Sequence, residues 1–162
     1  MIVMQSKVKT LFVKRSFQKK QKSLKKGIYI MEEKLDVLCE LVSVSSHLCS
    51  LFVDSEMAMN DGDIAQSQNF TKQGQNLLSV VIGDTFAEYK EEFGTTENDL
   101  FDYDVPSTLA LSKFCSQICY HASTLISLLH QGKTDVVFDN TAKLVAKDIN
   151  TVEQIYNLIF EN

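Results

Sequence analysis

The sequence is poor in residues that interrupt helices. Its 162 residues include one proline, six glycines and no tryptophan. A many-stranded β fold needs frequent turns, which proline and glycine usually supply, so their scarcity favours long helices. The glycines are also too scattered to build a phosphate-binding loop ahead of a helix. The sequence therefore argues against a nucleotide-dependent enzyme.

Long apolar runs are lacking as well. No stretch approaches the roughly 20 apolar residues that a membrane span needs. The segment Met1–Met4 is too short for the apolar part of a signal peptide. We therefore expect a soluble cytoplasmic protein, in which cysteines stay reduced. The sequence has four of them: Cys39, Cys49, Cys115 and Cys119.

Charge divides the chain into two parts. Residues 1–30 contain nine Lys or Arg and no acid, whereas residues 31–162 contain seven Lys and all 21 acids, a net charge of −14. A basic block of this kind is a tail or a targeting element rather than part of a core. We predict a basic leader over residues 1–30, disordered or not translated, and a single acidic helical-bundle domain over residues 31–162.

Three interpretations of the leader are open. Lys26-Gly27 can be encoded by AAAGGA, a purine-rich ribosome-binding sequence a few codons before Met31, which would make Met31 the true start. A basic arm for nucleic acid or anionic lipid is the second interpretation. A mitochondrial transit peptide is the third, although the segment is rich in Lys and has one Arg. The first is favoured because the segment has no sustained periodicity.

Apolar residues recur at spacings of three and four, the helical period, along four segments. These segments run over about residues 32–53, 70–93, 106–131 and 134–160. The last is the most regular, and its apolar residues form a heptad seam. The seam consists of Phe138, Ala142, Val145, Ile149, Val152, Tyr156 and Ile159. We predict an all-α bundle of at least four helices, mostly antiparallel.

The segments between these helices carry turn signals. Residues 54–69 are polar and contain the turn sequence Asn60-Asp61-Gly62-Asp63. Gly94 and Gly132 are typical helix C-caps, and Pro106 suits the first turn of the third helix. Gly83, inside the second helix, predicts a break or a close packing point.

Two short sequences resemble the YjaG-like family of small bacterial helical proteins of unknown function. The first is similar to the acidic segment that leads into a helix in that family, and it reads Phe101-Asp102-Tyr103-Asp104-Val105-Pro106. The second is similar to a stretch of the family's next helix, and it reads Lys147-Asp148-Ile149-Asn150-Thr151-Val152. Leu38-Cys39-Glu40 resembles its first helix more weakly. The resemblance covers about residues 35–152, with residues missing near 102–106 and without the family's longer C-terminal region. It implies an all-α fold and no reaction, cofactor or catalytic residue.

An acidic stretch is the feature that most suggests a binding surface. It contains eight acids and one lysine, Lys90. The ordinary interpretation is solubility; the functional one is a surface that is complementary to a cationic partner. The candidate partner-binding residues are Asp84, Glu88, Glu91, Glu92, Glu97, Asp99, Asp102 and Asp104.

The cysteines suggest a weaker alternative. Cys115 and Cys119 lie four residues apart on one helical face with His121 close by, a spacing that two helices could use for a metal site. Small apolar cysteines more often fill helix contacts, and burial would raise rather than lower their pKa. A di-iron site would need Glu-x-x-His, which does not occur.

These observations favour a non-enzymatic acidic protein-interaction module of the bacterial cytoplasm, such as an immunity protein or a nucleic-acid mimic that binds a cationic partner. They imply no cofactor and no membrane. Direct nucleic-acid binding by residues 31–162 is disfavoured because phosphate repels the negative charge. The alternatives are a metal-binding or thiol-based protein that uses Cys115, Cys119 and His121, and a structural homo-oligomer formed through the heptad seam.

Overall fold

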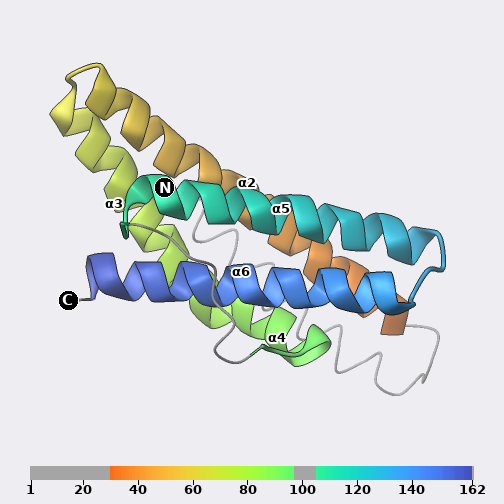
Figure 1. Cartoon of the computed structure of the whole chain (residues 1–162). Helices are drawn as coiled ribbons and strands as arrows, with labels where there is room; N and C mark the ends of the chain where they lie inside the picture. The colour runs from red at the N-terminus through yellow and green to blue at the C-terminus, as the bar shows by residue number, and fades with distance from the viewer. Residues whose placement is uncertain (1–29, 97–104, 162) are drawn as a thin grey trace.

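The computed structural model of the chain describes residues 30–96 and 105–161 (Figure 1). These residues form helices and no strand, which confirms the predicted all-α bundle. The helical elements are α2 (Ile30–Asn60), α3 (Ile64–Val81), the π-helical segment η1 (Ile82–Phe86), α4 (Ala87–Phe93), α5 (Thr108–His130) and α6 (Val136–Phe160).

Helix α2 and helix α3 form a hairpin whose turn is shorter than expected. The predicted turn is present, with a positive φ of 81° at Gly62 and the Asp63 side chain accepting a hydrogen bond from the Gln66 amide. The polar residues 54–69, however, are helical on both sides of this turn. Serines rather than apolar residues occupy the contact between the two helices there, so the apolar period does not mark them.

Helix α3 continues through η1 into α4 as one helical run. Gly83 lies in the π-helical segment, which agrees with the expected irregularity at this position. A π-helical turn widens a helix locally. Within it Thr85 is buried and donates a hydrogen bond to Glu40 Oε1 of α2 at 3.2 Å. The run ends as predicted at Gly94, where φ is 90°.

The caps of α5 and α6 are partly different from those expected. Ser107 caps α5 by accepting a hydrogen bond from the Ala110 amide at 3.1 Å. Pro106 therefore precedes the cap, and the prediction that it lies in the first turn is wrong. Gly132, with φ of 70°, follows α5 as predicted. Asp135 then caps α6.

The bundle is built from antiparallel neighbours. Short connections join α2 to α3 and α5 to α6, and α2 packs against both α3 and α5 (Figure 1). Six of the seven predicted seam residues of α6 are buried and Ile159 is partly buried against the core, which confirms the seam. Because these side chains fill the core of a single chain, the seam is not an open face.

Helix α2 is long and apolar enough over Met31–Asn60 to cross a membrane, by length and composition alone. The expectation that no stretch approaches a membrane span is therefore wrong by the measure of length and mean hydropathy. The serines of this helix interrupt its apolar residues but lower its mean hydropathy little. The core helix of a soluble protein and a signal sequence meet the same measure. In this bundle Leu38, Leu41 and Leu48 of α2 are fully buried.

Candidate functional site

Half of the predicted acidic residues lie in the described part of the chain. Asp84 belongs to η1, and Glu88, Glu91 and Glu92 belong to α4. Glu91 is exposed, Asp84 and Glu92 are half-buried, and Glu88 is buried, so Glu88 offers little surface to a partner. The other four lie outside the described residues: Glu97, Asp99, Asp102 and Asp104.

The only lysine of this acidic stretch is held by another acid. Lys90 Nζ donates to Glu153 Oε1 and Oε2 of α6, at 2.7 and 2.8 Å. Its charge is therefore balanced by Glu153 and does little to reduce the negative potential of its neighbours on α4.

Three of the four cysteines have a raised pKa, which favours the neutral thiol. Cys115 is fully buried, and burial raises its pKa. Burial also raises the pKa of Cys49, with Cys119 as the next cause, and that of Cys39, with Asp36 as the next cause. A nucleophilic cysteine needs the opposite shift.

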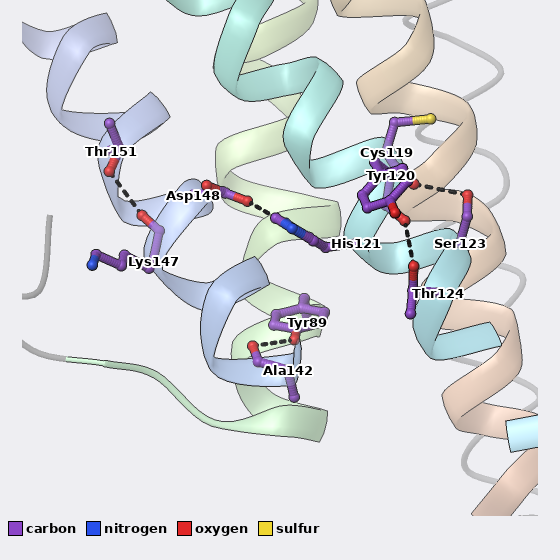
Figure 2. A network of polar contacts seen from close by, with 10 residues as sticks. All are labelled: Tyr89, Cys119, Tyr120, His121, Ser123, Thr124, Ala142, Lys147, Asp148 and Thr151. Atoms are coloured by element: carbon purple, nitrogen blue, oxygen red, sulfur yellow. Dashed lines mark hydrogen bonds and ion pairs between the residues drawn. The ribbon is translucent and has the colours of Figure 1, made fainter. Parts of the chain in front are cut away.

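The metal alternative has no ligand cluster in residues 30–96 and 105–161. No group of three or more His, Cys, Asp or Glu side chains there is placed to hold a metal ion. His121, one of the three candidate ligands, is instead directed at a carboxylate of α6 (Figure 2).

That carboxylate belongs to Asp148, which was not among the predicted site residues. The His121 Nδ1 and Asp148 Oδ2 atoms are 3.0 Å apart, so the pair joins α5 to α6. Asp148 is fully buried, whereas the His121 side chain is 21% exposed. The second carboxylate oxygen, Oδ1, is buried and has no hydrogen-bond partner among residues 30–96 and 105–161.

Burial controls the ionisation of Asp148. It raises the pKa of this carboxyl group to about 6, although the hydrogen bond and charge of His121, and then Lys147, lower it. Tyr89 of α4 lies near the pair, and its hydroxyl donates to the Ala142 carbonyl at 2.7 Å (Figure 2). Burial and then the charge of Asp148 raise the pKa of Tyr89 as well.

His121 also lines an open groove of about 560 Å³ on the outer side of α5 and α6, together with Ser116, Gln117, Tyr120 and Leu144. An imidazole that is oriented through one nitrogen by a buried carboxylate is a common arrangement for holding a proton or a ligand at the other nitrogen. The groove therefore places His121, but not the buried Asp148, within reach of solvent.

One sequence signal could have identified Asp148. It follows Val145 by three residues and precedes Val152 by four. These helical intervals place the acid on the same side of the helix as the apolar seam residues. An acid at such a position is buried and needs a partner. The partner could not be named, because His121 is 27 residues away on another helix.

Comparison with known proteins gives no relative: no protein-family model, no curated protein and no solved structure matches this chain. The resemblance to the YjaG-like family stays a prediction.

Proposed function

We propose that this protein is a non-enzymatic interaction module that binds a cationic protein partner. One observation carries the proposal: the described residues contain seven lysines and 17 acids. A surface of one sign attracts a partner of the other sign, accelerates encounter and disfavours partners of like charge. An immunity protein that occupies a basic toxin, or a mimic of nucleic acid, has this character.

The proposed contact surface is the exposed side of η1 and α4. Asp84, Glu91 and Glu92 lie on this helical run, and the acids between 97 and 104 follow it directly in the chain. Lys90, the one lysine of this stretch, is itself paired with Glu153. Affinity would then depend on charge and fall as salt screens it.

The alternatives are less well supported. A thiol-based activity is disfavoured because burial raises the pKa of Cys39, Cys49 and Cys115. A homo-oligomer formed through the α6 seam is disfavoured because that seam is occupied inside one chain.

The experiment first captures the partner and then measures its binding to this protein with both proteins purified. The tagged protein is used to retain binding proteins from native lysate, and the retained protein is then produced separately. Its dissociation constant is measured at about 50 and 300 mM NaCl, where the screening length differs several-fold. We expect affinity to fall at the higher salt, and to fall when Glu91→Gln and Glu92→Gln are combined.

A charge-matched control separates this surface from net charge. Asp139→Asn with Glu161→Gln removes two exposed acids at the two ends of α6. We expect this variant to bind nearly as the unchanged protein does. A partner whose affinity ignores salt and the α4 substitutions would refute the proposal.

A further inference from the structure

The free end of the α2–α3 hairpin has its polar side chains inside. Ser55 and Ser67 are buried between the two helices. The Ser67 hydroxyl donates to the Ser55 carbonyl at 2.8 Å, and the Ser55 hydroxyl donates to the Ser67 carbonyl at 3.1 Å. Thr71 adds a hydroxyl contact to Ser55 at 2.6 Å. Hydrogen bonds therefore hold this end together, where apolar packing holds the rest of the bundle.

The apolar side chains of the same end are outside. Met57, Met59 and Ile64 are 58%, 50% and 57% exposed. Figure 1 shows that this end of the hairpin extends beyond the described helices α5 and α6. Met57 and Met59 are two residues apart in α2 and so lie on opposite helical faces. Of the three residues, Met57 lines a groove at this end.

A groove crosses this end between the two helices. Its α2 wall is formed by residues 54, 57, 58 and 61, which share one helical face, and its α3 side by residues 63, 66 and 70. The groove has a volume of about 400 Å³. Its apolar lining consists of Met57, Ala58 and Phe70, and its acids are Asp54, Asp61 and Asp63.

We infer that this groove docks a basic amphipathic segment of a partner protein. The apolar face of such a segment would cover Met57 and Phe70, and its Lys or Arg side chains would meet Asp54 and Asp61. Methionine suits this role because its unbranched side chain adapts to the partner's shape. A helix laid into an apolar groove is a recurrent mode of peptide recognition.

Charge decides between the possible occupants of the groove. A second copy of the chain in the same groove would bring two sets of three aspartates together, which is repulsive. An anionic lipid surface would meet the same repulsion. A basic segment is attracted, and it satisfies both the apolar and the acidic parts of the lining.

This inference rests on the proposed function, because both take the partner to be cationic. It differs in placing the contact with the partner at the α2–α3 groove instead of at α4. The probe is a synthetic, fluorescently labelled peptide of Leu and Lys, designed as an amphipathic helix. Its affinity for the full chain is measured by fluorescence anisotropy. A second peptide of the same composition, with Leu and Lys shuffled so that no apolar face forms, is the ligand control.

Two variants of the groove test its two parts. Met57→Ser removes an exposed apolar contact, and we expect affinity for the amphipathic peptide to fall about tenfold. Asp54→Asn with Asp61→Asn is expected to weaken binding severalfold at low salt and to reduce its salt dependence. Val136→Ser, at a residue 66% exposed at the start of α6, is the matched apolar control and is expected to change nothing.

Each outcome has a defined meaning. Equal binding of the shuffled peptide, or unchanged binding by Met57→Ser, overturns the groove assignment. If the Glu91 and Glu92 substitutions weaken binding and the groove variants do not, the proposed function stands and this inference fails. If no variant matters, this inference fails, and the proposed function is decided by the captured partner. Sedimentation tests whether the chain self-associates. Self-association that is abolished by Met57→Ser would identify a second copy of the chain as the occupant of the groove and would overturn the assignment of a basic segment.

Discussion

Among individual residues, Asp148 has the most unusual environment. Its carboxyl group is fully buried, and within the described part of the chain one of its two oxygens has a hydrogen-bond partner, which is His121. His121 and Lys147 favour the ionised form, but burial outweighs them and raises the pKa from 3.8 to about 6. The folded protein therefore keeps this proton to higher pH than the unfolded chain does.

The sign of the pH dependence follows from this difference. Between about pH 4 and pH 6 the folded state binds more protons at Asp148, so the contribution of this residue to the free energy of unfolding falls as pH rises. Asp148→Asn cannot titrate but can still accept a hydrogen bond from His121. We expect the stability of the variant relative to the unchanged protein to increase by roughly 3 kcal/mol from acidic to neutral pH.

Urea unfolding at several pH values from about 4 to 7.5 measures this difference, since this range brackets the raised pKa. Asp139→Asn, which removes an exposed carboxylate from the same helix, is the control and should follow the unchanged protein closely. Parallel stability curves for Asp148→Asn and the unchanged protein would show that Asp148 titrates normally.

At the scale of helices, we expect substitution by alanine at two glycines of one helical run to change the stability in opposite directions. A Cβ at Gly74 would lie 2.5 and 2.7 Å from Cε1 and Cζ of Phe52, whose ring is buried and cannot retreat. A Cβ at Gly83 would meet nothing within 4 Å. The first glycine permits close approach of α2 and α3; the second has no such role.

We therefore expect Gly74→Ala to lower the free energy of unfolding by about 1–2 kcal/mol, because overpacking exceeds the gain in helix propensity. Gly83→Ala should raise it by about 0.5–1 kcal/mol. Thermal and urea unfolding of the two variants, measured side by side, provide the comparison. A stabilised Gly74→Ala would contradict the close contact with Phe52.

The serine contact of the α2–α3 hairpin gives a separate prediction. Ser55→Ala should cost about 1–3 kcal/mol, because it removes a buried hydroxyl on which Ser67 and Thr71 depend. Combined with Ser67→Ala, the loss should be smaller than the sum of the two single losses. Ser123→Ala is the control, since that exposed hydroxyl donates to the Cys119 carbonyl of its own helix. Additive losses in a double-mutant cycle would refute the coupling.

The same hairpin shows which parts of the fold could be predicted from the sequence. The seam of α6 and the glycines at 94 and 132 were predictable, because an apolar period and a positive φ both leave local signals. The helical state of residues 54–69 was not, because hydroxyl groups replace the apolar period there. The pairing of His121 with Asp148 was not predictable either, since it depends on how two helices align.

At the scale of the whole molecule, the described core lies entirely within the predicted acidic domain. Its buried apolar residues run from Val37 to Tyr156, and the first described helix begins at Ile30. A chain that starts at Met31 therefore keeps every residue of this core. Its net charge would be −14 instead of −5, since the removed segment contributes nine positive charges.

We expect this shortened chain to retain its helical circular dichroism and to unfold in a single cooperative transition, as one domain of this size should. The added self-repulsion should lower its stability modestly at low salt, and salt near physiological strength should restore most of the loss. Calorimetry of both chains at two salt concentrations measures this. Loss of helix, or a deficit that salt does not reduce, would show that residues 1–30 contribute to folding by more than their charge.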